Sequence, residues 1–241
     1  MASCLRKPLW FVLALSVAVL AGVSAAQAYT YMDLNNLGGL QLMSYDDPWN
    51  IIPKNQGNTI DGNSYVLSGF TIERIFGWQN SNYEDAKYNT IFNDGQPQGT
   101  VNFVNFHTNQ SITLSGVNLF AAYDIIEREV YRAMSSFSLY YSNDGNTWNP
   151  IISGFVTYDP LNSTNRYTIP GSTWQAMAAG FTFDPVTASY FRAEFVQYGK
   201  GQWQGVRVCE LDAVVVPLPA AVWLLGSGLL ALAGTRRLGN K

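Results

Sequence analysis

The sequence predicts an all-β fold of the sandwich or barrel type, and two observations lead to this prediction. Apolar residues seldom recur at helical spacing; they alternate with polar residues in short segments, which clusters of Gly, Asn, Asp and Pro separate. The dipeptide Asp-Gly, a strong signal for a tight turn, occurs at positions 61, 94 and 144. Many short strands between turns are typical of a sandwich or a barrel.

The clearest predicted strand is residues 137–141, where Phe137, Leu139 and Tyr141 share one face. Residues 191–195 repeat this alternation, with Arg192 and Glu194 opposite the apolar face. Residues 29–60 are less regular and predict an N-terminal strand followed by loops. The other predicted strands are residues 101–106, residues 111–120 with a break at Ser115-Gly116, and residues 209–215, where Cys209, Leu211, Ala213 and Val215 oppose Glu210 and Asp212.

The composition excludes several classes of function. Charged residues make up only 13% of the 241 residues, against about 25% in a typical soluble domain. The single histidine excludes a multi-histidine metal site, and two cysteines are too few for a disulfide scaffold. The formal charge is −3, so there is no concentrated basic surface of the kind that nucleic acid requires, and no nucleic-acid partner is expected.

The N-terminus has the pattern of a secretory signal peptide over residues 1–28. Arg6 and Lys7 precede an almost wholly apolar segment, residues 9–23, and Ala26-Gln27-Ala28 follows. Small residues at these two positions are what signal peptidase recognises, so cleavage is expected before Tyr29. The alternative is an uncleaved membrane anchor.

The C-terminus carries a second apolar segment. Residues 214–234 contain no charge, and Arg236 and Arg237 follow directly. At about 1.5 Å per residue, a helix of this length crosses a hydrocarbon core of about 30 Å. Basic residues after the span favour a cytoplasmic tail and a body on the far side of the membrane.

The same residues resemble the PEP-CTERM sorting signal, in its Val-Pro-Leu-Pro-Ala variant. A proline pair, a glycine-bearing apolar helix and a basic end follow one another in residues 216–241, and Leu218 replaces the glutamate of the Pro-Glu-Pro form. The resemblance implies export in a Gram-negative bacterium, processing by an exosortase, and a final location at the cell surface or in extracellular matrix. The membrane would be a partner only before processing, and an ordinary membrane anchor is the alternative. The sorting-signal residues are Pro217, Leu218, Pro219, Ala220, Arg236 and Arg237.

The two ends together carry five basic residues and no acidic residue. The body, residues 29–215, therefore has nine basic and 17 acidic residues, a net charge of −8. This acidity favours solubility and disfavours anionic partners. The body is also long enough to bury a core without disulfides.

An aromatic strand, an Asp-Gly turn and a tryptophan occur in order in residues 137–148, after an earlier Asp-Gly at Asp94. Together with residues 188–195 and 208–211, these motifs resemble discoidin domains, also called coagulation factor 5/8 type C domains, over about residues 90–215. The last two segments are similar to the last two strands of that family. The resemblance implies a galactose-binding-like jelly-roll sandwich, and it adds a structural calcium as an expectation. The chain lacks the cysteine pair that closes animal members.

Catalytic chemistry finds little support in the sequence. A Ser-His-Asp triad would have to use His107, and no Gly-x-Ser-x-Gly motif is present. Glu127 and Glu129 could imitate a glycosidase pair, but charges of alternating sign around them are typical of a solvated strand or loop. The aspartates do not have the spacing of an EF-hand loop, and those before glycine are typical turn residues.

Aromatic residues, 14% of the composition, indicate binding rather than catalysis. Several lie among polar residues or glycines, where a ring can stack on the apolar face of a sugar while amides and charged groups bond its hydroxyls. Core filling is the alternative for each ring. We therefore predict an exported, non-enzymatic protein that binds a polysaccharide or surface glycan through loops at one end of a sandwich; a matrix protein without a specific ligand and a secreted hydrolase are the alternatives. The candidate binding residues are Trp78, Asn80, Tyr83, His107, Arg132 and Trp203.

Overall fold

The computed structural model describes most of the predicted body. The described residues are 27–38, 42–43, 48–49, 58–77, 89–126, 129–161, 164–167 and 174–216. Trp78, Asn80 and Tyr83 lie outside them, as do nearly all of the predicted signal peptide and the tail from Pro217 onward. Within the described part of the chain, no helix is long and apolar enough to cross a membrane.

The described residues form strands and two short 3₁₀ helices, which confirms the predicted all-β class. Two of the strands are unusually long and organise the others. The elements are β1 (Tyr29–Asp33), η1 (Leu34–Leu37), β2 (Thr59–Asn63), η3 (Ile72–Ile75), β3 (Thr90–Ile91), β4 (Val101–Ile126), β5 (Glu129–Tyr131), β6 (Met134–Ser142), β7 (Asn149–Val156), β8 (Tyr158–Asp159), β9 (Thr164–Asn165), β10 (Trp174–Gln197) and β11 (Arg207–Val215).

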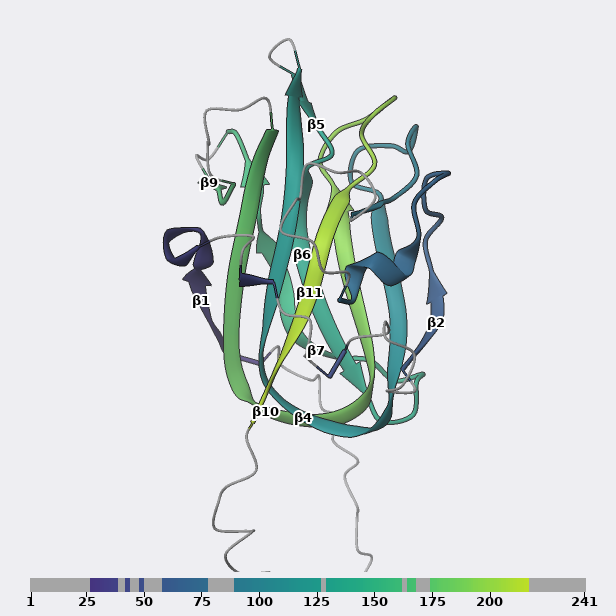
Figure 1. Ribbon diagram of the computed structural model, residues 1–241, viewed down its shortest axis with the longest axis vertical. Helices are drawn as coiled ribbons and strands as arrows, with labels where there is room; N and C mark the ends of the chain where they lie inside the picture. The colour runs from purple at the N-terminus through teal and green to yellow at the C-terminus, as the bar shows by residue number, and fades with distance from the viewer. Residues whose placement is uncertain are drawn as a thin grey trace, which may run out of the picture.

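The long antiparallel strands β4 and β10 run through both layers of the molecule, as Figure 1 shows. In the first layer, the second half of β4 pairs with β11, which pairs with β3, and the first half of β10 pairs with β1. In the second layer, the first half of β4 pairs with β2, and the second half of β10 pairs with β6, followed by β7. The result is a two-layer antiparallel sandwich.

We call the end where β4 and β10 pass between the layers the closed end. The register of β10 shifts between Thr182 and Val186 and again between Ala188 and Tyr190, as expected where strands bend. Hydroxyl groups join the two strands here: Thr113 to Thr187 at 2.8 Å, and Ser111 to Ser189 at 2.8 Å. The opposite end, formed by loops, is called the loop end.

The core lies between the layers and is rich in aromatic rings. Phe181 of the first layer lies 5.8 Å from Phe137 and 4.8 Å from Phe155 of the second, between ring centroids. Phe191, Ala193 and Phe195 are fully buried, whereas Arg192 and Glu194 between them point outward, which confirms the predicted alternation. Burial of such rings stabilises the sandwich through the hydrophobic effect and ring–ring contacts.

Three local predictions were wrong. The chain continues as strand through His107 and through Ser115-Gly116, because both segments pair with β10. Asp61-Gly62 forms a bulge in β2 rather than a turn, since the register with β4 shifts between Ile60 and Gly62. Cys209 lies with Phe120 on the outer side of the first layer, because a bulge between Val208 and Glu210 moves it away from the face of Leu211.

Candidate functional site

Three segments meet at the loop end and bring together Arg132, Asp94, Trp203 and Gly205, which we call the Arg132–Trp203 cluster. Asp94 lies after β3, Arg132 directly follows β5, and the other two lie in the loop between β10 and β11. Asp94 starts the turn at Asp94-Gly95 that the sequence predicts. The cluster joins residues far apart in the chain, so the fold rather than a local motif creates it.

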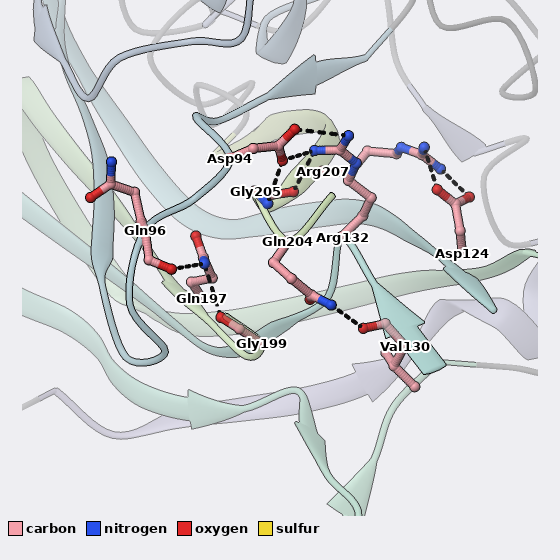
Figure 2. Close-up of polar contacts among 10 residues, drawn as sticks. All are labelled: Asp94, Gln96, Asp124, Val130, Arg132, Gln197, Gly199, Gln204, Gly205 and Arg207. Atoms are coloured by element: carbon pink, nitrogen blue, oxygen red, sulfur yellow. Dashed lines mark hydrogen bonds and ion pairs between the residues drawn. The ribbon is translucent and has the colours of Figure 1, made fainter. Parts of the chain in front are cut away.

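Arg132 is the buried centre of the cluster, with 4% of its side chain exposed. Its Nη1 donates to Oδ1 of Asp94 and, at 3.5 Å, to the Gly205 carbonyl, and its Nη2 donates to Oδ2 of Asp94 at 3.4 Å (Figure 2). The Gly205 amide donates to the same carboxylate at 3.0 Å. Burial lowers the pKa of Arg132, and Asp94 opposes this shift. The carboxylate therefore neutralises a buried cation.

A second ion pair supports the first. Arg207 donates through both terminal nitrogens to Asp124, at 2.8 and 2.7 Å, in the two-pronged geometry favoured by guanidinium and carboxylate (Figure 2). The Arg207 amide also donates to the Arg132 carbonyl at 3.0 Å. The guanidinium groups of Arg132 and Arg207 are thus each paired with a carboxylate.

Trp203 is the exposed part of the cluster. Its side chain is 52% exposed, and the guanidinium carbon of Arg132 lies 5.5 Å from the centroid of its ring, in cation–π contact. Arg132 and Trp203 are also the non-glycine residues in the described part of the chain that have a positive φ, 69° and 65°. Such backbone conformations are unfavourable for bulky residues and are concentrated at functional sites.

Two buried glutamines fix the loop that carries Trp203. Gln204 donates to the Val130 carbonyl at 3.0 Å, and Gln197 donates to the carbonyls of Gln96 and Gly199, both at 2.9 Å (Figure 2). The loop is also closely packed: a Cβ at Gly199 would lie 2.0 Å from Oε1 of Gln204. The tryptophan is therefore displayed on a constrained loop.

The structure unites two of the six predicted binding residues, Arg132 and Trp203. His107 lies in the interior of β4, six residues from Val101, which places it about 20 Å along the strand from the loop end. There its Nδ1 contacts Asp61 at 2.8 Å. Sequence reasoning missed Asp94 as a site residue, because an aspartate before glycine is fully explained as a turn residue.

The aspartates that could supply oxygen ligands to calcium are bonded to other protein groups in the described structure. Asp94 pairs with Arg132, Asp61 with His107, and Asp144 accepts hydrogen bonds within its own turn. Among the described residues, no three acidic, histidine or cysteine side chains are grouped to hold a metal. These residues do not fit the six to eight oxygen ligands that calcium requires; Asp46 and Asp47 lie outside the described residues.

Comparisons with known proteins identify neighbours in shape only. No protein-family model and no curated protein sequence matches the chain. Among solved structures, it is similar to the CBM32-1 and CBM32-2 domains of Clostridium perfringens ZmpB in complex with GalNAc, with 15% identity over 81% of this chain and 43% of that one, at a TM-score of 0.47.

Two further structures from Clostridium perfringens are similar. CBM32-3 of a family 31 glycoside hydrolase has 10% identity over 66% of this chain and 91% of that one, at a TM-score of 0.43. The family 32 CBM of NanJ, in complex with galactose, has 11% identity over 65% and 92%, at a TM-score of 0.41. The residues of the Arg132–Trp203 cluster, not these similarities, carry the functional argument.

Proposed function

We propose that this protein is a non-enzymatic carbohydrate-binding protein with a galactose-binding-like jelly roll, and that it holds a sugar at the Arg132–Trp203 cluster. The observation that carries the proposal is Trp203: a large ring, more than half exposed, on a constrained loop with a positive φ. Exposing such a ring and straining its backbone both cost stability, which selection tolerates where the ring has a ligand.

The surroundings of Trp203 favour a neutral sugar. Arg132 is paired with Asp94 and the neighbouring Arg207 with Asp124, so these two ion pairs carry no net charge. The indole offers an apolar surface to the C–H face of a sugar ring. Asp94, whose side chain is 18% exposed, and the exposed Gln202 provide polar groups for hydroxyls beside it. An apolar platform with a few fixed polar groups is the usual composition of a small-ligand site.

The test is calorimetric titration of the full-length chain with galactose, N-acetylgalactosamine, glucose and mannose. We expect one of these sugars to bind and Trp203→Ala to weaken that binding by about tenfold or more, as loss of a central aromatic contact does. Leu161→Ala is the matched control, because Leu161 is 92% exposed and lies in the segment between β8 and β9. Binding that Trp203→Ala leaves unchanged would refute the site.

We also propose that the chain is exported and sorted by an exosortase through its Val-Pro-Leu-Pro-Ala tail, in a Gram-negative bacterium, and that it acts at the cell surface or in the matrix. The limits of the sandwich support a division of the chain into signal peptide, body and sorting tail, since β1 begins at Tyr29 and β11 ends at Val215. Mass spectrometry of the mature protein is the test. A mature chain that keeps Arg236 and Arg237 would contradict processing of the tail.

A further inference from the structure

The outer face of the second layer carries a row of planar side chains on neighbouring strands. Along β10, Phe191, Ala193 and Phe195 are buried against the core, so Tyr190, Arg192 and Glu194 point outward. On β4, Val104 and Phe106 are likewise buried, which directs their neighbours outward. We call the outward set the planar face; its members are Phe103, His107, Tyr140, Tyr190, Arg192 and Glu194.

Register places these side chains side by side. Tyr190 is paired with His107, and Glu194 with Phe103, across β10 and β4. On the other side of β10, Arg192 is paired with Tyr140 of β6. Paired positions on adjacent strands lie about 5 Å apart, and alternate positions along a strand about 7 Å apart. The planar face therefore continues across three strands.

One half of the planar face is built around His107 and Tyr190. Their ring centroids are 5.3 Å apart, and Nδ1 of His107 contacts both oxygens of Asp61, at 2.8 and 2.9 Å. The turn at Gly145 supports Tyr190, since a Cβ there would lie 3.2 Å from the tyrosine ring. His107 is 30% exposed and Asp61 37%, so this half is open to solvent.

The other half centres on Arg192. Its Nε donates to Glu194 at 2.7 Å, and its guanidinium carbon lies 4.5 Å from the centroid of the Phe103 ring. Burial of Tyr140, and then its contacts with Glu194, raise the pKa of that phenol, so it stays neutral. Arg192 and Glu194 remain 27% and 20% exposed. The charges of Arg192 and Glu194 cancel.

The geometry points to the planar face as a second binding surface, for an extended chain of neutral polysaccharide. Half-buried aromatic rings and a guanidinium group on one sheet face offer apolar surface to consecutive sugar rings, and the paired charges of Arg192 and Glu194 leave no attraction for an anionic polymer. The net charge of −8 on the body also disfavours anionic chains. The planar face runs along β4 from about 7 Å to about 20 Å from the loop end and contains no residue of the Arg132–Trp203 cluster, so it does not depend on that cluster.

The test uses affinity electrophoresis of the full-length chain in native gels that contain galactomannan, soluble β-glucan or alginate. All variants carry Trp203→Ala, which removes the main contact of the loop-end cluster. We expect one of the two neutral polymers to retard this protein and alginate not to. Adding Tyr190→Ala, or separately Arg192→Gln, should weaken the retardation about fivefold. Met32→Ala is the control, because Met32 is 49% exposed on β1 in the first layer.

The outcomes separate the two proposals. Retardation that both Tyr190→Ala and Arg192→Gln leave unchanged, or that occurs only in alginate, would overturn the planar face as a glycan surface. Sedimentation in which Tyr190→Ala converts a dimer to a monomer would also overturn it, in favour of an interface between two copies. Loss of monosaccharide binding in Trp203→Ala concerns only the loop end. If Tyr190→Ala lowers the thermal midpoint measured by circular dichroism, its weaker retardation reflects lost stability. The retardation of Arg192→Gln alone then tests the planar face.

Discussion

The two ends of the sandwich are closed in different ways. At the closed end, β4 and β10 continue from one layer to the other, and backbone pairing with a few hydroxyl contacts holds the bend. At the loop end, the strands stop, and side chains bond to the backbone of other segments. Arg132, Gln197 and Gln204 each do this across at least one loop.

This difference shows where a sandwich can accommodate a site. A continuous ladder satisfies backbone groups irrespective of side-chain identity, so the closed end depends less than the loop end on particular polar side chains. The loop end depends on particular side chains, and it is there that a non-glycine positive φ occurs, at Arg132 and Trp203. Strain of this kind persists only where the surrounding contacts determine the conformation.

The largest effect is expected at the loop end, from Arg132→Ala. This change leaves Asp94 beside buried backbone without its cation and should lower the free energy of unfolding by about 3 kcal/mol. Arg207→Ala is the control, since that pair is more exposed, at 17% and 26%, and should lose about 1 kcal/mol. Urea unfolding followed by circular dichroism measures both. Equal losses would mean that the loop end does not depend on the buried pair.

The closed end should respond to backbone crowding instead. A Cβ at Gly116 would lie 2.5 Å from the Phe181 carbonyl oxygen, across the pairing of β4 with β10. We expect Gly116→Ala to lower the free energy of unfolding by about 2 kcal/mol, as overpacking does. Gly62→Ala is the matched change in open space and should stay within about 0.5 kcal/mol of the parent. A small effect of Gly116→Ala would show that the backbone at the bend shifts to accommodate the added methyl group.

Comparing two substitutions of Trp203 should isolate the strain at the loop end. Trp203→Gly and Trp203→Ala both remove the ring and its contact with Arg132, but only glycine adopts φ 65° without steric cost. We therefore expect Trp203→Gly to be about 1 kcal/mol more stable than Trp203→Ala in thermal unfolding. Equal stability would mean that the loop relaxes when the ring is removed.

The smallest effect concerns Asp144, in the turn between β6 and β7. Hydrogen bonds from the backbone of Thr147 and Asn146, and then from the Ser142 hydroxyl, hold the pKa of Asp144 well below its usual value. Because the folded state favours the ionised form, this contribution is present above about pH 4 and is lost as the pH falls. The difference between the thermal midpoints of the parent and Asp144→Asn should thus be full at pH 7 and shrink steadily as the pH falls from 4 to 2. A constant difference would contradict this linkage.

Much of the fold could be predicted because alternation directly reflects burial. Phe191 and Phe195 face the core as their spacing indicates. The bulges at Gly62 and Cys209 could not be found in this way, since one extra residue reverses the faces and no local signal marks it. The length of β4 was also missed, because the turn-forming residues Asn109 and Ser115-Gly116 are overridden by pairing with β10.

The candidate site was predictable only in part. Trp203 stands out as a tryptophan among glycines and glutamines, whereas Arg132 lies at the end of a segment of alternating charge. Their contact depends on Asp94, which is 38 residues from Arg132 in the chain. Only the sandwich brings such distant segments together, and the left-handed backbone of both residues has no sequence signal in a non-glycine residue.

Strand β11 runs the length of the sandwich from the loop end to the closed end. This strand starts at Arg207, whose amide donates a hydrogen bond to the Arg132 carbonyl at the loop end, and reaches Val215 beside Leu114 at the closed end, about 26 Å away. β1 likewise begins beside Phe183, near the same closed end (Figure 1). The polypeptide therefore enters and leaves on one side. A chain attached to a surface through either terminus would therefore hold Trp203 at the end of the sandwich that lies farthest from that surface.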